Sequence, residues 1–310
     1  MADKTVIVID VQGEVTYTTP ENRTSKPLTP GAVIPPDSTV KLGKDASVSL
    51  YENHPIFITK KGKRAIKKLI DKNKIPVRGT FEFFFKDQLT YALGDLKDEP
   101  AANEDYGFTK TSSDDDEEDT TDGWGENALR VINVMKCKEK VVPCSLKFEW
   151  GGLKGASTYE LTVAGADDDT VVLNACVTGT TLKTDLKDLA LETDKEYWWQ
   201  VKPKDGNASG KSEKSFFIIT KPDADSKSVE KLKSVKCFSD AGPVLKAFMK
   251  AVRLERDELL SEAYKIYEGL YNSSPGNDVV KRMFMAFLWR NNMKSLAREL
   301  MGMNTAVHSN

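Results

Sequence analysis

The sequence predicts a multidomain chain in which two all-β domains are followed by an all-α segment of helical hairpins. Three observations lead to this fold class. The chain has 310 residues, about twice the usual length of one domain. Before Ser226 it contains short runs of β-branched and aromatic residues, several of which alternate with polar ones, as is typical of strands. From about Ser226 onward the apolar residues recur every three or four positions, as is typical of amphipathic helices.

An acidic tract separates the two β domains. Residues 95–126 hold thirteen acidic side chains against Lys97 and Lys110, a local net charge of −11. Such a tract repels itself and has almost nothing to bury, so we expect a solvated linker. The expected organisation is therefore a β domain at 1–93, a flexible acidic linker at 94–127, a β-sandwich at 128–222 and a helical segment at 226–304.

The first β domain is expected from four short runs rich in β-branched, aromatic and apolar residues: Thr5–Ile9, Val15–Thr18, Ser47–Tyr51 and Ile56–Ile58. Its glycines, prolines and apolar positions occur in the order found in one family: Gly13–Val15, Pro27–Gly31, Thr39–Gly43 and Ala46–Leu50. Over about residues 8–75 the chain resembles the FecR-type β domain. That resemblance implies a regulatory domain of a kind that is usually periplasmic and flanked by a membrane anchor.

The second β domain is expected from five further runs: Ser145–Trp150, Tyr159–Val163, Val171–Leu173, Tyr197–Val201 and Ser215–Ile219. The order of Phe148–Trp150, Gly155–Leu161, Leu191 and Tyr197–Val201 is similar to that of a fibronectin type III-like sandwich, over about residues 142–220. The resemblance implies that the Tyr197 hydroxyl bonds to the backbone near Leu191. It also implies that Trp150 and one of Trp198 and Trp199 fill the core.

The helical segment is expected to contain helices from Pro243, from Glu258 to Tyr271, from Val279 to Arg290 and from Met293 to Met301. Glu262-Ala263 and Leu296-Ala297 are separated by the 34 residues of the tetratricopeptide period. Residues 243–303 therefore resemble two degenerate tetratricopeptide-like helix pairs. Since an isolated solenoid needs about three repeats, we expect these helices to dock on another domain or another chain.

No catalytic or metal-binding motif is present in the sequence. The two histidines, His54 and His308, lie in a turn and near the C-terminus, where neither suits a catalytic triad. Cys137 and Cys144 are too far apart in sequence for an ordinary zinc hook, and their oxidation state is left open. We therefore expect neither an enzyme nor a cofactor nor a metal site.

A basic patch contains eight cations in fifteen residues: Lys60, Lys61, Lys63, Arg64, Lys67, Lys68, Lys72 and Lys74. The apolar pairs Ala65-Ile66 and Leu69-Ile70 predict a short amphipathic helix whose lysines face water. Two other interpretations stay open, contact with an acidic partner or the acidic linker, and binding of nucleic acid. The patch contains no aromatic residue on which a base could stack, which disfavours nucleic acid.

The candidate protein-binding residues lie in the helical segment. They share an apolar or aromatic character: Tyr267, Met283, Phe284, Phe287 and Trp289. Residues 283–289 are apolar around nearly the whole helix, which exceeds one buried stripe. We expect a second buried face, covered by the sandwich, by self-association or by another protein.

Three domains of binding type without a catalytic motif predict a non-enzymatic adaptor or scaffold for protein–protein interactions in a bacterial assembly or signalling complex. Alternatives are a signalling regulator that senses through its N-terminal domain, and a nucleic-acid-associated factor that uses Lys60–Lys74. A formal net charge of −2 gives no global case for nucleic acid, and no apolar run is long enough to cross a bilayer. The expected location is the cytoplasm, or the periplasm if a leader has been removed. The partner, oligomeric state and pathway stay open.

Overall fold

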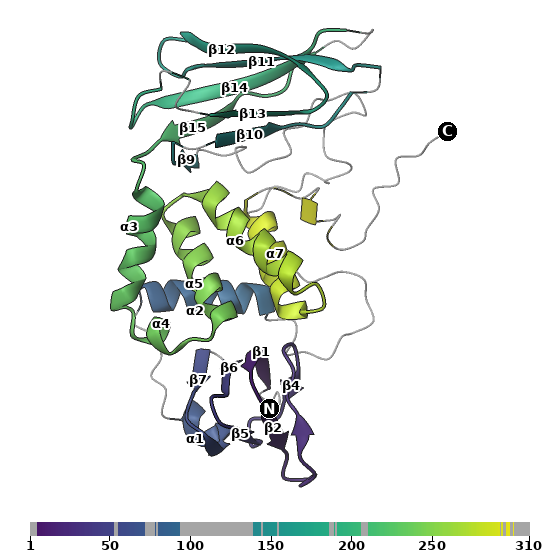
Figure 1. Cartoon of the computed structure of the whole chain (residues 1–310), viewed down its shortest axis with the longest axis vertical. Helices are drawn as coiled ribbons and strands as arrows, with labels where there is room; N and C mark the ends of the chain where they lie inside the picture. Colours follow the sequence, from purple (N-terminus) through teal and green to yellow (C-terminus); the bar gives the residue numbers. More distant parts are fainter. Residues whose placement is uncertain are drawn as a thin grey trace, which may run out of the picture. The chain divides into compact units, whose positions relative to one another are not determined.

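The computed structural model divides the chain into two compact units (Figure 1). Unit 1 consists of Met1–Phe108, Ser228–Leu254 and Ala263–Phe287, and unit 2 of Thr109–Lys227, Glu255–Glu262 and Leu288–Asn310. The structure describes residues 5–52, 55–71, 78, 80–93, 139–143, 145–153, 155–185, 189, 191–205, 210–291, 293, 296–297 and 300. Outside them lie the expected linker at 94–127, His54, His308, Lys72, Lys74, Cys137, Cys144 and most of the expected last helix.

The N-terminal part of unit 1 contains two four-stranded antiparallel sheets, in the orders β4-β1-β6-β7 and β3-β2-β5-β8. The strands are β1 (Val6–Gln12), β2 (Val15–Thr18), β3 (Lys26–Pro27), β4 (Val33–Ile34), β5 (Thr39–Leu42), β6 (Ser47–Tyr51), β7 (Pro55–Ile58) and β8 (Gly62–Ala65). All four strands expected from the sequence are present. In β5 and β7 the β-branched and aliphatic residues at alternate positions give the strand one buried apolar face.

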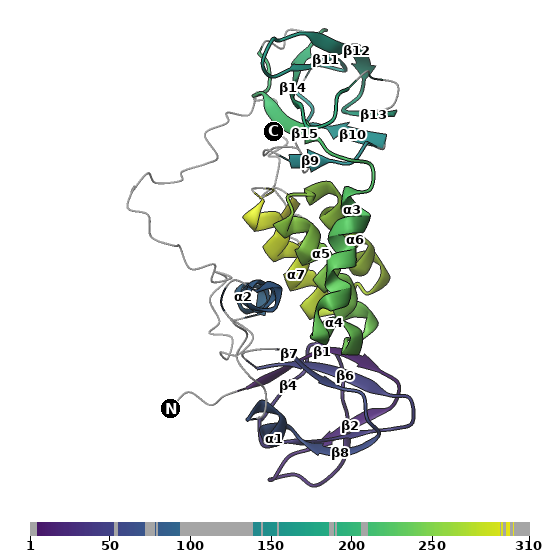
Figure 2. The same cartoon turned by 90° about the vertical axis from the view of Figure 1, so that its left-hand side faces the viewer.

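The core of this domain lies between the two sheets (Figure 2). Val8 and Leu50 are paired in the first sheet, Val15 and Leu42 in the second, and all four belong to one buried cluster. A short helix, α1 (Ile66–Ile70), adds Ile66 to the cluster. It lies where the spacing of apolar residues predicted a short helix.

The sheet that contains β1 is also buried on its outer face. Ile7 and Ile9 are inaccessible to solvent, although alternation points them away from Val6 and Val8. Helix α2 (Phe81–Leu93) covers part of this face, and the Thr90 hydroxyl hydrogen-bonds the Tyr51 hydroxyl. Burial raises the pKa of Tyr51, a shift that this hydrogen bond opposes. The β domain expected at residues 1–93 did not include α2, although Phe81, Phe85 and Leu89 recur at a spacing of four.

Several helices follow the second β domain in the sequence. They are α3 (Ala224–Glu230), the short 3-10 helix η3 (Lys231–Ser234), α4 (Lys236–Asp240), α5 (Pro243–Arg256), α6 (Leu260–Ser273) and α7 (Asp278–Arg290). Gly242 accepts the Lys246 N–H at the start of α5 and lies against the buried Asp10 of β1. Unit 1 is thus assembled from an N-terminal segment and two segments that follow the second β domain in the sequence.

Gly242→Ala is expected to lower the free energy of unfolding of unit 1 by about 1 to 3 kcal/mol. A Cβ atom at Gly242 would lie 2.6 Å from Asp10 Oδ2, whose side chain is buried and bonded to Gln12 through its other oxygen. The matched control is Gly269→Ala in α6, where a Cβ atom would meet nothing within 4 Å. That change should instead stabilise the unit by about 0.8 to 1 kcal/mol through helix propensity. Native-state hydrogen exchange of β1 and α5 measures the change in stability for both variants. If the two variants changed the stability in the same direction, the close contact between Gly242 and Asp10 would be contradicted.

Unit 2 contains a five-stranded sheet, β12-β11-β14-β15-β9, and a two-stranded sheet, β10-β13. The strands are β9 (Glu139–Val141), β10 (Ser145–Glu149), β11 (Thr158–Gly165), β12 (Val171–Thr178), β13 (Thr181–Asp185), β14 (Glu196–Pro203) and β15 (Ser215–Ile219). All five strands expected for this domain are present. The pairing of β9 with β15 is parallel, and the other described pairs in both sheets are antiparallel.

Aromatic side chains fill the space between these two sheets. Trp150 and Trp199 belong to one buried cluster, and the ring centroids of Phe148 and Trp199 lie 5.1 Å apart. The Tyr197 hydroxyl accepts the Glu192 N–H at 2.9 Å, next to the expected position at Leu191. The predicted corner is therefore present, and Trp199 rather than Trp198 is the second core tryptophan.

One carboxylate closes the end of the sandwich where β14 stops. Asp205 accepts the N–H groups of Ser157 and Thr158, both at 2.9 Å, and the Ser157 hydroxyl at 2.5 Å. These hydrogen bonds, with that of the Ser157 hydroxyl the largest cause, lower the pKa of Asp205 from 3.8 to about 2. They favour the charged carboxylate in the folded state.

Asp205→Asn is expected to weaken the pH dependence of sandwich stability in acid. Because the folded pKa lies below the unfolded one, the stabilisation is present above 3.8 and is lost as the pH falls to about 2. Wild type and variant should therefore differ in urea midpoint at neutral pH and converge near the folded pKa. Tryptophan fluorescence follows the transition, with Asp167→Asn as an exposed control. A constant difference down to the lowest pH would argue against this role of Asp205.

Candidate functional site

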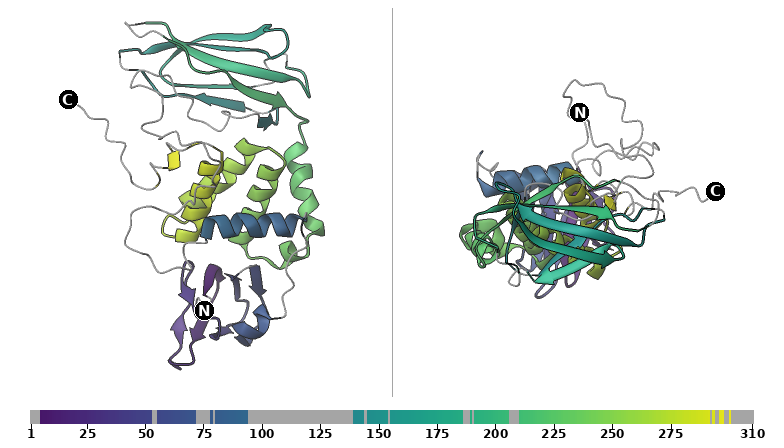
Figure 3. Two further views of the ribbon diagram at one scale, coloured as in Figure 1. Left: turned by 180° about the vertical axis from the view of Figure 1, so that it is seen from behind. Right: turned by 90° about the horizontal axis from the view of Figure 1, so that it is seen from above.

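The outer face of the five-stranded sheet carries an apolar row that crosses four strands. Strand alternation turns Tyr197 and Trp199 of β14 into the core and Trp198 to the opposite face. Trp198 is directly opposite Phe216 of β15 on one side and Ala164 of β11 on the other, and Ala164 is opposite Val171 of β12. We call Val171, Ala164, Trp198 and Phe216 the apolar row. Figure 3 shows the strands of this sheet side by side in its right-hand view.

The two ends of the apolar row are exposed to solvent. The exposed fraction is 54% for Val171 and 36% for Phe216, against 8% for Trp198 and 0% for Ala164. Only Val33 and Tyr91, both in unit 1, are comparably exposed among the large hydrophobic residues that the structure describes. An apolar strip with exposed ends on a sheet face is a feature typical of interaction surfaces.

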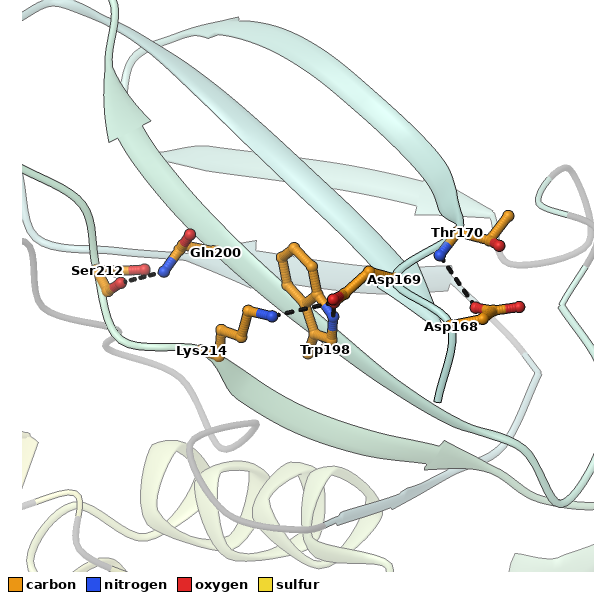
Figure 4. Close-up of polar contacts among 7 residues, drawn as sticks. All are labelled: Asp168, Asp169, Thr170, Trp198, Gln200, Ser212 and Lys214. Carbon is orange, nitrogen blue, oxygen red and sulfur yellow. Dashed lines mark hydrogen bonds and ion pairs between the residues drawn. The ribbon is translucent and has the colours of Figure 1, made fainter. Parts of the chain in front are cut away.

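A charged pair, Asp169 and Lys214, lies against Trp198 (Figure 4). Its Nε1 donates to Asp169 Oδ1 at 2.8 Å, and Lys214 Nζ donates to the same oxygen at 3.1 Å. Lys214 Nζ also lies 3.8 Å from the centroid of the Trp198 ring, in the range of a cation–π contact. The indole therefore has polar partners on its edge and on its face.

The turn between β11 and β12 holds Asp169 in place. Asp168 Oδ1 accepts the Thr170 N–H at 3.0 Å, which closes a local Asx turn. Asp169 has a φ of 51°, in the left-handed region that aspartate tolerates better than most residues. In this backbone conformation, the Asp169 carboxylate lies beside β14 and accepts the Trp198 Nε1–H. Of the three consecutive aspartates at 167–169, Asp168 thus serves the turn and Asp169 the contact, and strand periodicity alone reveals neither role.

The segment that carries Lys214 is anchored to β14 as well. Gln200 Nε2 donates to the Ser212 carbonyl at 2.7 Å, and the Ser212 hydroxyl accepts the Val201 N–H at 3.0 Å. Ser212 is buried, so both bonds are shielded from water. Lys214 follows two residues later and is thereby kept beside Trp198.

Hydrogen bonds keep the Asp169 carboxylate charged. The bond from Lys214 is the largest cause, followed by that from Trp198, and together they lower the pKa of Asp169. The pKa of Asp168 is also lowered, chiefly by the Thr170 backbone N–H. The apolar row is therefore bordered by fixed opposite charges, Lys214 and Asp169. Such a border favours partners with complementary polar groups around an apolar contact.

The candidate protein-binding residues of the helical segment lie mainly inside unit 1. Tyr267, Met283, Phe284 and Phe287 are buried, while Trp289 of unit 2 is half-buried. The ring centroids of Tyr267 and Phe287 lie 4.8 Å apart, and those of Tyr267 and Phe284 lie 6.3 Å apart. The structure thus brings these three aromatic residues together as a core between α6 and α7.

The basic patch is on β8, α1 and the turn before them. Lys60, Lys61, Lys63, Lys67 and Lys68 are exposed. Arg64 is half-buried and donates to the Lys63 carbonyl at 2.9 Å. The described part of the patch therefore presents five ammonium groups to solvent.

The residues that the structure describes include no group of three histidine, cysteine, aspartate or glutamate side chains placed to hold a metal ion. Cys176 is exposed on β12, whereas Cys237 is half-buried on α4. Burial raises the pKa of the Cys237 thiol to about 11, which disfavours its reactive thiolate. None of the described helices combines the length and apolar character needed to cross a bilayer.

Two packed sheets with an aromatic core define this part of unit 2 as a β-sandwich. No protein-family model matches the chain, and no curated protein matches it either. Solved structures similar to it include an fn3 domain of human collagen alpha-1(XX) chain, at 19% identity and a TM-score of 0.21, covering 31% of this chain and 81% of that one. An Fn3-like protein from Clostridium thermocellum has 16% identity and a TM-score of 0.19, with 28% and 90% covered. The FN1-FN3 domains of chicken CNTN1 have 9% identity and a TM-score of 0.21, with 70% and 57% covered.

Proposed function

We propose that this protein is a non-enzymatic adaptor whose β-sandwich binds a protein partner through the outer face of its five-stranded sheet. The observation that carries the proposal is the apolar row, with its exposed ends at Val171 and Phe216. Aromatic residues in the centre of a surface patch contribute much of the binding free energy in protein complexes. The Lys214–Asp169 pair supports specificity, because it fixes one positive and one negative charge beside the apolar row. A partner binds well only if its own charges are complementary at these two positions.

The proposal is tested by a change at the exposed end of the row that leaves the core alone. The full chain and its Phe216→Asp variant are used as baits in lysate of the source organism, and retained proteins are identified by mass spectrometry. A stoichiometric partner held by the wild type should be lost by Phe216→Asp, because the carboxylate would be desolvated against an apolar contact. The matched control is Tyr91→Asp, which removes an exposed aromatic side chain from α2 in unit 1.

Retention of the partner by Phe216→Asp and its loss by Tyr91→Asp would move the binding surface to unit 1 and overturn the proposal. As a folding control, the hydrogen-exchange protection of β14 in Phe216→Asp and in Tyr91→Asp should equal that of the wild type, which would show that the sandwich is intact. If neither wild type nor variants retained a protein, the adaptor function itself would be wrong.

A second candidate function is binding of an anionic partner through the basic patch. The observation that favours it is the exposure of five lysines on β8, α1 and the preceding turn. A filter-binding titration with single-stranded RNA at two salt concentrations tests it, since phosphate contacts give a steep salt dependence. Binding that is absent at low salt would exclude this candidate.

The finer family assignments stay predictions. The FecR-like interpretation of the first domain, the tetratricopeptide-like interpretation of the helices and the signalling role rest on the sequence alone. So do the cytoplasmic location and the place in a bacterial assembly.

A further inference from the structure

The outer edge of β12 lacks the features that protect most sheet edges. Among the residues that the structure describes, β12 ends the five-stranded sheet and pairs on one side only, with β11. Its eight residues include no charged side chain and no proline. Unpaired N–H and C=O groups of such an edge can template another strand, and proteins usually prevent this with charges, proline or very short strands.

Every other edge strand within the described ranges has at least one of these protective features. β4 is two residues long, and β3 and β7 contain proline. Charged residues occur in the remaining edge strands β8, β9, β10 and β13. β9, at the opposite edge of the same sheet, is also occupied, because the Lys140 N–H donates to the Glu258 carbonyl at 2.9 Å. Among these edges, β12 is the long unprotected one.

We propose that β12 pairs antiparallel with β12 of a second copy of this chain, so that two five-stranded sheets join into one. The occupant is inferred from charge. A two-fold axis places a strand against its own sequence, and like charges directly opposite each other destabilise a sheet. A strand without charges meets no such penalty, and its half-buried inner residues, Leu173 and Ala175, would be covered by the copy.

The geometry of the sheet restricts the register. In an antiparallel pair, residues directly opposite each other point to the same face of the sheet. A two-fold axis perpendicular to the sheet does not exchange its faces. The axis must therefore pass between one residue and the same residue of the second copy. The bulge between β11 and β12 interrupts regular alternation before Leu173. Centres at Ala175 and at Cys176 each pair five residues of the regular part of the strand, and of these two only Ala175 brings the half-buried Leu173 into the pairing. Asn174 then lies opposite Cys176 of the second copy, and both are exposed on the outer face.

The test measures the mass of the full chain in solution by sedimentation equilibrium over a wide concentration range. The wild type should reach the mass of two copies. Asn174→Lys/Cys176→Lys places lysine opposite lysine twice, and the species with two copies should be lost. Asn174→Lys/Cys176→Glu places lysine opposite glutamate twice in the same register, and that species should return.

Hydrogen exchange of β11 and β14 controls for folding of the sandwich in both variants. A wild type with the mass of one copy at every concentration would overturn the self-pairing and leave the edge to a strand of another protein. Two variants with the same mass as each other would show that association uses another surface or register, and would equally overturn it. Phe216→Asp, three strands away, should not change the mass, so this inference and the adaptor proposal fail independently.

Discussion

Replacing Trp199 with alanine is expected to lower the free energy of unfolding of the sandwich by about 3 to 5 kcal/mol. The Trp199 side chain is fully buried between the two sheets and packs edge-on against Phe148. Its removal deletes a large apolar contact and leaves a cavity that the surrounding strands cannot fill. Native-state hydrogen exchange of β11 and β14 in the full chain measures this loss without interference from unit 1.

Phe216→Ala provides the control for this prediction. Phe216 is also aromatic and lies on the adjacent strand, but it points outward and is partly exposed. Its removal should cost no more than about 1 kcal/mol, the range of strand propensity. If Trp199→Ala cost no more than Phe216→Ala, the assignment of inward and outward faces in β14 and β15 would be wrong.

Phe287→Ala is expected to lower the free energy of unfolding of the α6–α7 region by a similar amount, about 3 to 5 kcal/mol. Phe287 is inaccessible to solvent, and Tyr267 and Tyr264 pack against its ring at centroid distances of 4.8 and 6.4 Å. The sequence placed Phe287 among the candidate protein-binding residues. A core role predicts a large loss of stability, whereas a binding role predicts loss of a partner at little cost in stability.

Hydrogen exchange of α6 and α7 measures this loss, and Phe287→Leu is the conservative control. Leucine retains most of the apolar contact, so that variant should lose less than about 1.5 kcal/mol. If Phe287→Ala preserved the protection of both helices yet released a protein partner, α7 rather than the sandwich would be the docking surface.

The strands could be predicted from sequence because their signal is local. The resemblance to a fibronectin type III-like sandwich implied that one of Trp198 and Trp199 fills the core, and the structure assigns this position to Trp199. The same resemblance implied the corner formed by Tyr197, whose partner Glu192 is only five residues away. Helix α2 was missed, although Phe81, Phe85 and Leu89 carry a helical spacing.

The candidate site could not be predicted, because it depends on pairing between strands. Val171, Ala164, Trp198 and Phe216 form a row only through the registers of three strand pairs, which no single segment encodes. The contact of Lys214 with Asp169 joins residues 45 positions apart. The burial of Tyr267 and Phe287 likewise depends on packing between helices. An apolar helix face on its own does not distinguish a core from a docking surface.

The assembly of unit 1 from segments far apart in the sequence has a consequence for synthesis. Strand β1 ends at Gln12, whereas helix α5 begins at Pro243. At roughly 5 to 20 residues per second, a ribosome needs on the order of 10 to 50 s to make the chain between them. Throughout this interval β1 lacks the segment at Gly242 that lies against its buried Asp10 in the finished protein. The sandwich core, which is continuous in sequence, is therefore expected to form on the nascent chain before the first domain is complete.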